Sequence, residues 1–143
     1  DATDLPFVHN FFDAVVSTDS YNYFGRDERY LDEKLLPFVK SGSYIYIAIP
    51  GMKKDCHEHL PPELLLSWTP EQLSYMRDVT YWRDTVSKCK GAQVLTVAEM
   101  ESNEEVWADW LRQENEYAIG DRRSMEAGGG RYLNFIKIVL RKK

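Results

Sequence analysis

Short apolar runs alternate with amphipathic segments along the chain, and this alternation predicts an α/β fold. The run FDAVVS at residues 12–17 is too brief for a helix, so it favours a central strand that is buried on both faces. The run YIYIAI at 44–49 is β-branched and aromatic, and Pro50-Gly51 should end it. Between the two runs, Asp27 can cap a short amphipathic helix, and SGS at 41–43 can form a turn. The sequence therefore predicts a strand–helix–strand unit with parallel strands.

A long helix is predicted in the middle of the chain. Thr69 and Gln72 have the spacing of a capping box, and Pro70 occupies the first helical position. The pattern that follows indicates a helix that runs to about Cys89 and is ended by Gly91. Its inward face should consist of five side chains, Leu73, Met76, Val79, Trp82 and Val86.

Two further strands are predicted at residues 93–99 and 132–141. Between them, Ser102 and Glu105 have the spacing of a second capping box, so a helix should begin there. Residues 119–130 combine charged side chains with several glycines, which is typical of a loop. Because the two strands lack a compact crossover, we expect them to pair antiparallel, with the helix inserted between them.

Composition and charge narrow the class of partner. The chain has 143 residues, of which 43% are hydrophobic, and this suffices for one domain with a real core. The formal net charge is −5 and no basic stripe gathers Lys and Arg, so no nucleic-acid partner is expected. No apolar run approaches the length of a membrane span, so no membrane partner is expected. Cys56 and Cys89 are isolated thiols, which favours a reducing, cytoplasmic setting.

Two other groups of residues contain types that often bind ligands, but an ordinary structural role explains each of them. The connection over residues 52–67 is long enough to cover a site, and it contains His57 and His59. This spacing matches no standard zinc pattern, so we expect a solvated loop and no metal. Trp107 and Trp110 share one face of a predicted helix, where tryptophans belong more often to a core than to a ligand site.

The segment after the first strand is the first place to look for chemistry, because ligands of open α/β sheets bind beyond the carboxyl ends of the strands. Residues 17–24 (STDSYNYF) form a polar and aromatic segment at that position. Asp19 could orient a polar substrate group or cap the next turn, and we favour the cap. The last four residues of the segment are equally compatible with lining a substrate pocket and with ordinary packing.

Several segments, taken in order, resemble class I S-adenosylmethionine-dependent methyltransferases. Residues 1–7 (DATDLPF) and the run FDAVVS resemble the motifs that follow the third strand and form the fourth strand of that family. Residues 36–45 (LPFVKSGSYI) are similar to its LKPGG turn into the fifth strand. The remaining order of helix, strand, inserted helix and apolar strand resembles its antiparallel sixth and seventh strands. The resemblance covers essentially all 143 residues.

This resemblance implies an α/β fold that forms the C-terminal half of a Rossmann-like methyltransferase sheet, with parallel strands followed by an antiparallel pair and helices on the faces. It implies S-adenosylmethionine as the cofactor and methyl transfer to a small-molecule acceptor as the activity of the parent enzyme. Asp1 and Ala2 would contact the adenine, and Ser17 and Thr18 would also bind the cofactor. The substrate would lie against Tyr21, Asn22, Tyr23 and Phe24, with Asn22 and Tyr23 at positions where the family often has His. No catalytic residue is assigned.

The family's Gly-rich cofactor turn and its ribose-binding acidic residue have no counterpart in the sequence. The glycines at 128–130 precede a predicted strand rather than a helix, which is the wrong context for such a turn. We therefore expect residues 1–143 to be the C-terminal portion of a single methyltransferase domain. Its first strand would leave one sheet edge bare, which invites association between copies. A non-catalytic α/β module used for protein association is the alternative that the sequence leaves open.

Overall fold

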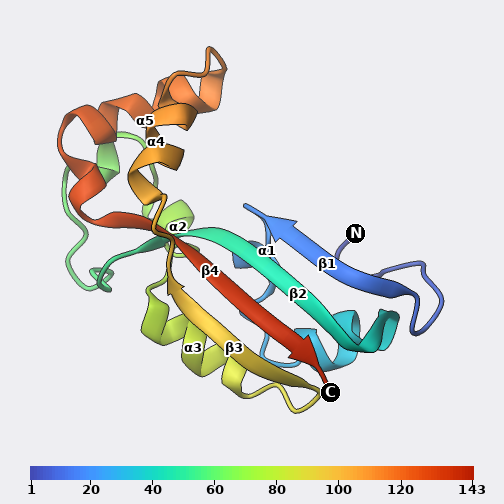
Figure 1. The fold of residues 1–143 in the computed structure, drawn as a ribbon. Coiled ribbons are helices and arrows are strands. Elements are labelled where there is room, and N and C mark those ends of the chain that lie inside the picture. Colours follow the sequence, from blue (N-terminus) through green and yellow to red (C-terminus); the bar gives the residue numbers. More distant parts are fainter.

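A four-stranded mixed sheet organises the molecule (Figure 1). The computed structural model describes residues 1–143, and its strands are β1 (Phe12–Thr18), β2 (Val39–Met52), β3 (Ala92–Glu99) and β4 (Leu133–Lys142). The strand order is β1-β2-β4-β3. β1 and β2 are parallel, whereas β4 runs antiparallel to both β2 and β3. The predicted fold class, parallel strands followed by an antiparallel pair, is confirmed.

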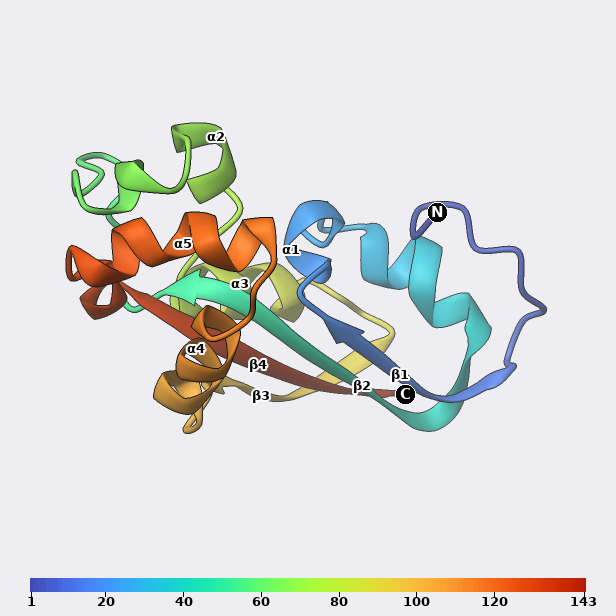
Figure 2. The same ribbon diagram turned by 90° about the horizontal axis from the view of Figure 1, so that it is seen from above.

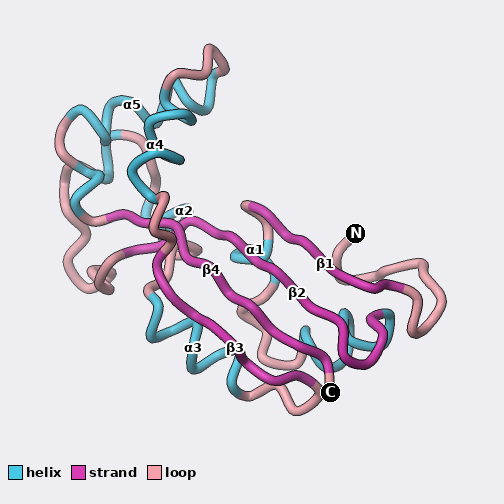
Figure 3. The backbone as a smooth tube through the Cα atoms, in the orientation of Figure 1, coloured by secondary structure: helices cyan, strands magenta, loops and turns pink.

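The helical segments are short and gather behind the sheet and at one end of it (Figures 1 and 3). α3 packs against the rear face in the view of Figure 1, while α4 and α5 lie beyond the ends of β2, β3 and β4. The segments are α1 (Tyr21–Phe24), a π-helical turn (Leu31–Leu35), α2 (Pro70–Leu73), α3 (Val79–Ser87), α4 (Asn103–Leu111), α5 (Glu116–Glu126) and the 3-10 turns Leu36–Phe38, Leu64–Leu66 and Gly129–Arg131.

The main core lies between the sheet and α3. Alternate residues of a strand point to the same face, so one set of side chains from β2 and β4 meets the helix. Ile45, Ile49 and Ile138 are fully buried there, and Trp82 and Val86 of α3 cover them. A second, smaller cluster under α4 and α5 contains Met52, Leu64, Trp68, Leu73, Trp107 and Leu133.

The opposite face of the sheet carries no helix over β1, and α4 covers only its far end, where Trp107 packs against Phe135 (Figure 2). Val16 of β1 is 73% exposed, and Tyr44 and Tyr46 of β2 stack on each other at a centroid distance of 5.9 Å while staying exposed. β1 is also an edge strand, because only β2 pairs with it. The prediction that residues 12–17 form a central strand buried on both faces is therefore wrong for this chain, which supplies neither a second neighbouring strand nor a covering helix.

β2 is longer than the apolar run that predicts it. The expected turn at 41–43 is an irregularity within the strand, where Gly42 adopts φ 81° and its carbonyl accepts a hydrogen bond from Arg141. The expected stop at Pro50-Gly51 does not occur, because both residues pair with β4. β1 already ends at Thr18 opposite Ala48, so Pro50 lies beyond the reach of that strand and its missing N–H breaks no bond to β1.

The predicted long helix over 69–89 is two helices. The capping box of Thr69 and Gln72 is present, as predicted, and begins α2. α2 ends after one turn, and Asp78 then caps α3 by accepting a hydrogen bond from the N–H of Tyr81 at 2.8 Å. The helix is interrupted for two reasons. The side chain of Asp78 caps a new helix. The carbonyl of Arg77, the preceding residue, accepts a hydrogen bond from the N–H of Met52.

Two details of the region before β4 also differ from the sequence prediction. α4 begins where Ser102 predicts it, but the Ser102 side chain makes no capping hydrogen bond. Residues 119–130 are largely α5 and not a loop. Asn115 caps this helix by accepting from the N–H groups of Tyr117 and Ala118. Only Ala118 and Ser124 of α5 are buried, so the helix has no apolar stripe that a pattern could reveal.

Candidate functional site

The carboxyl end of β1 carries a short polar turn before α1. Asp19 lies in the left-handed backbone region, with φ 49°, and its N–H donates to the Ala48 carbonyl at 2.8 Å. The hydroxyls of Ser17 and Ser20 share a hydrogen bond of 2.9 Å across this turn. The favoured capping role of Asp19 is wrong, because its carboxylate makes no hydrogen bond and α1 has no side-chain cap. Asp and Asn adopt this conformation more readily than other non-glycine residues, and Asn10 is the other example in the chain.

The four residues of α1 divide into a buried and an exposed part. Tyr21 is buried, with its ring between those of Phe24, Tyr30 and Trp82 at centroid distances of 5.6, 5.9 and 5.7 Å. Burial raises the pKa of Tyr21, so its phenol stays protonated at neutral pH. Asn22 is also buried, and its side-chain oxygen has no hydrogen-bond partner. Tyr23 is 59% exposed and faces the ring of Tyr75 at 5.1 Å.

A groove of about 380 Å³ runs beside β1 and brings several predicted site residues together. Ser17 and Thr18 line it with Tyr21 and Phe24, whereas Asn22 and Tyr23 lie outside the lining. The full set of lining residues is Leu5, Val15, Val16, Ser17, Thr18, Ser20, Tyr21, Phe24, Tyr30, Leu35, Ile45 and Ile47. The groove thus has apolar walls and hydroxyl groups at the carboxyl end of β1.

The N-terminal residues reach this groove through one hydrogen bond. The hydroxyl of Tyr30, which lines the groove, donates to the Ala2 carbonyl at 2.9 Å. Asp1 is exposed, and its carboxylate accepts hydrogen bonds from the N–H and hydroxyl of Thr3. Ala2 is therefore joined to the groove, while Asp1 lies one residue further out.

Asp121, an acidic residue of α5, influences the pKa of Asp19. In Figure 2, α5 lies over the carboxyl end of β2, and one end of the helix approaches α1. Asp19 is exposed, but the surrounding protein partly desolvates its carboxyl group and so raises its pKa, and the negative charge of Asp121 raises it further. Burial also raises the pKa of Asp121, although hydrogen bonds from the indole groups of Trp110 (2.9 Å) and Trp68 partly offset this. Both carboxylates are thus shifted toward neutral pH at the same end of the sheet.

Asp121 is a site residue that the sequence pattern misses. It lies in a segment that has the composition of a loop, so nothing in the pattern brings it near Asp19. Ser67 provides part of the placement, because its hydroxyl donates to the Gly120 carbonyl and accepts from the N–H of Ser124. The long connection before α2 thereby holds α5 over the end of the sheet.

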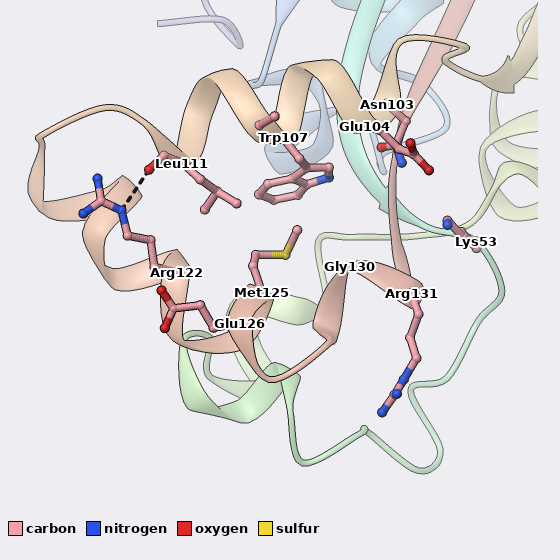
Figure 4. Close-up of a pocket in the computed structure, with 11 residues that line it drawn as sticks. Lys53, Asn103, Glu104, Trp107, Leu111, Arg122, Met125, Glu126, Gly130 and Arg131 are labelled. Carbon is pink, nitrogen blue, oxygen red and sulfur yellow. Dashed lines mark hydrogen bonds between the residues drawn. The ribbon is translucent and has the colours of Figure 1, made fainter.

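A larger cavity of about 850 Å³ lies between α4 and α5 and was also missed (Figure 4). It is lined by Lys53, Asn103, Glu104, Trp107, Ala108, Leu111, Arg122, Met125, Glu126, Gly130 and Arg131. Trp107 is buried in its wall, in line with the prediction that this residue belongs to a core. The cavity shares no lining residue with the groove beside β1.

The His-containing loop is fixed to α2. Nδ1 of His57 lies 2.8 Å from Asp55, and Nε2 lies 2.9 Å from the Leu73 carbonyl. No group of three or more His, Cys, Asp or Glu side chains in the chain could hold a metal ion. Cys56 and Cys89 are free thiols. None of the helices is both long and apolar enough to span a bilayer.

No protein-family model and no curated protein matches the sequence, but solved structures match its fold. Phosphoethanolamine N-methyltransferase 2 of Haemonchus contortus, solved with S-adenosyl-L-methionine, is 16% identical over 99% of the chain, with a TM-score of 0.71. Geranyl diphosphate C-methyltransferase of Streptomyces coelicolor A3(2), solved with Mg²⁺, geranyl diphosphate and S-adenosyl-L-homocysteine, is 11% identical over 100% of the chain, with a TM-score of 0.67. The fold of this chain is that of the S-adenosylmethionine-dependent methyltransferases.

The same fold also serves a different reaction. The [4+2]-cyclase SpnF matches 99% of the chain at 16% identity, with a TM-score of 0.60. The chain covers 53% of that cyclase, 51% of the geranyl diphosphate enzyme and 36% of the phosphoethanolamine enzyme. The fold is therefore established and the reaction is not, because identity at this level does not carry an activity from one protein to another.

Proposed function

We propose that residues 1–143 are the substrate-side portion of a methyltransferase domain that transfers a methyl group from S-adenosylmethionine to a small-molecule acceptor. The observation that carries this proposal is the pair Asp19 and Asp121, two carboxylates of raised pKa at the carboxyl end of β1 in a methyltransferase fold. Ligands of open α/β sheets bind at this end. The chain covers about half or less of the two methyltransferases described above, which supports the view that further residues complete the site.

S-adenosylmethionine is the proposed cofactor, with Asp1, Ala2, Ser17 and Thr18 as its contacts. The two methyltransferases described above were solved with S-adenosylmethionine or S-adenosylhomocysteine. The groove fits part of such a molecule, because hydroxyls of Ser17 and Thr18 stand at one end of apolar walls. The hydrogen bond from Tyr30 to Ala2 would keep the N-terminal contacts beside that groove.

S-adenosylmethionine supplies an already activated methyl group when it is bound, so the protein's contribution is positioning and proton transfer. Asp19 is the proposed base, because its carboxylate makes no hydrogen bond and its raised pKa brings it closer to neutral pH. Tyr23, whose pKa is raised by burial as well as by the charge of Asp19, presents an aromatic ring that packs with that of Tyr75, and an acceptor could pack against this pair. Tyr21, Asn22 and Phe24 would support this surface from below.

We also propose a cellular location, a class of methyl acceptor and a mode of self-association for the chain. Two free thiols in a chain with an ample core support a reducing, cytoplasmic setting. A small-molecule acceptor is supported by the geranyl diphosphate bound to one neighbouring structure. Copies of the chain are also proposed to associate through the bare edge of β1.

Variants of the groove test the cofactor proposal. In the chain extended by the coding sequence upstream of Asp1, Thr18→Val should weaken S-adenosylhomocysteine binding in calorimetry by about tenfold, as expected for one lost polar contact. Thr96→Val, on β3 far from the groove, is the matched control and should leave the affinity unchanged. Equal affinities for both variants and the unaltered protein would rule out the assignment of Thr18.

The acceptor class is tested with a labelled methyl donor. The extended protein is incubated with labelled S-adenosylmethionine and a cell extract that has been separated by size. Label should appear in the small-molecule fraction, and Asp19→Asn should abolish most of the transfer because the proposed base is lost. Label that appears only in proteins or nucleic acids would overturn the small-molecule proposal.

A further inference from the structure

The cavity between α4 and α5 takes no part in the proposed methyl transfer, but it has a polar end and an apolar middle that could hold a ligand. Figure 4 shows Lys53, Asn103 and Glu104 at one end, with Trp107 and Met125 facing each other across the middle. Leu111 lies toward the opposite end. In this cavity of about 850 Å³ an apolar middle therefore adjoins one polar end, while Arg122 and Glu126 lie on the side of Leu111 and Met125.

The middle of the cavity suits an apolar group. The ring of Trp107 is held firmly, because it packs against Trp68 at 6.3 Å and Phe135 at 5.2 Å between ring centroids. Met125 on the other wall has a flexible thioether side chain that adjusts to irregular shapes. A rigid aromatic wall opposite an adaptable one is a common arrangement in small-molecule pockets.

Trp107 also carries an unused hydrogen-bond donor. The residue is only 7% exposed, and its indole Nε1 is buried without any acceptor. Buried indole N–H groups usually have a partner, because leaving one unpaired is costly in free energy. In Figure 4 the nitrogen-bearing edge of the ring is turned toward the end of the cavity with Asn103 and Glu104. A bound oxygen atom at that end would satisfy this donor.

The same end offers one free charge of each sign. Two of the three cations in the lining are already occupied: Arg122 donates to the carbonyls of Leu111 and Gln113 and pairs with Glu114, and Arg131 pairs with Glu63. Lys53 makes no ion pair, and neither does Glu104 or Glu126, the two acidic residues of the lining; Figure 4 shows only Glu104 at the end with Lys53. A ligand that meets both must carry a negative and a positive group close together.

We propose that this cavity binds an apolar α-amino acid. Its carboxylate would accept hydrogen bonds from Lys53 and from the indole N–H of Trp107, and its ammonium group would pair with Glu104. Its side chain would lie between Trp107 and Met125 and extend toward Leu111. The site is independent of the proposed methyl transfer, because it shares no residue with the groove beside β1, and it can be tested without any cofactor.

Binding of L-leucine to the 143-residue chain tests the ligand chemistry. The readout is the indole N–H resonance of Trp107 in a ¹H–¹⁵N spectrum, assigned by its loss in Trp107→Phe. Leucine should shift this resonance in a saturable manner. Two analogues that each lack one charge, 4-methylpentanoate and 3-methylbutylamine, should bind about tenfold more weakly or worse. No shift with leucine, or equal binding of either analogue, would overturn the proposal.

Charge variants at neighbouring positions provide matched controls. Lys53→Met and Glu104→Gln should each weaken leucine binding by about tenfold, because each removes one of the two charged contacts. Lys54→Met and Glu105→Gln change the adjacent residues, which do not line the cavity, and should leave the affinity unchanged. Circular dichroism is the check that each of the four variants is folded. Equal affinities across the four variants would contradict the proposed contacts.

Discussion

At the scale of single residues, the chemistry of the site depends on which side chains the turn after β1 exposes. Chain order alone places residues 17–24 at the carboxyl end of β1, and the structure agrees with that position. It does not reveal that Tyr21 turns into the core while Tyr23 stays exposed, because a single helical turn sends neighbouring residues in different directions. Nor does it reveal Asp121, which reaches Asp19 only through the packing of α5.

Because the charge of Asp121 raises the pKa of Asp19, replacing Asp121 should change the pH at which Asp19 ionises. Asp121→Asn removes the negative charge that raises the pKa of Asp19, so the pKa of Asp19 should fall. Carboxyl-carbon NMR titration measures this directly. Since the proposed base must be ionised, the loss of methyl transfer on acidification should move to lower pH in this variant. Asp109→Asn, an exposed aspartate on α4, is the control and should change neither quantity. An unchanged Asp19 titration in Asp121→Asn would contradict the coupling.

At the scale of elements, the helices that sequence predicts well are those with local signals. The capping box of Thr69 and Gln72 involves residues three apart, so it is visible in the sequence and is present in the structure. α5 has a good cap at Asn115 but almost no apolar face, so it depends on contacts such as those of Ser67 with Gly120 and Ser124. Contacts across more than fifty residues leave no periodic pattern.

Replacing glycine by alanine should have opposite effects on stability at Gly120, where helix propensity decides, and at Gly51, where close packing decides. Gly120 lies inside α5, and a Cβ added there would meet nothing within 4 Å. Gly120→Ala should therefore stabilise the protein by about 0.5–1 kcal/mol, through higher helix propensity. At Gly51 a Cβ would lie 2.6 Å from the Arg77 carbonyl and 2.4 Å from Ile136. Gly51→Ala should destabilise by about 1–3 kcal/mol. Urea unfolding measures both, and effects of the same sign would contradict this description.

At the scale of the whole molecule, the sheet is the part that sequence predicts best. The parallel pair, the antiparallel pair and the inserted helical segment all follow from the spacing of four apolar runs. The exposure of β1 does not follow from its own residues, because FDAVVS has the composition of a buried strand. Burial of a strand is decided by its neighbours, and β1 has a neighbour on one side only.

The bare edge predicts association between copies. An exposed apolar edge strand pairs readily with another chain, and Val16 is the most exposed large apolar residue of β1. The chain should therefore show a mass above that of a monomer in size-exclusion chromatography with light scattering at high concentration. Val16→Lys should restore the monomer, since charges on an edge oppose pairing. Thr80→Lys, at an exposed position of α3, is the control. A strictly monomeric unaltered chain would exclude this association.

Cofactor binding tests the proposal that this chain forms part of the site of an S-adenosylmethionine-dependent methyltransferase. The measurement is calorimetric titration of S-adenosylhomocysteine into the chain extended by the coding sequence upstream of Asp1. The extended protein should show saturable binding with one site per chain, and residues 1–143 alone should show weak or absent binding. An extended, folded protein that takes up no S-adenosylhomocysteine would overturn the proposed function.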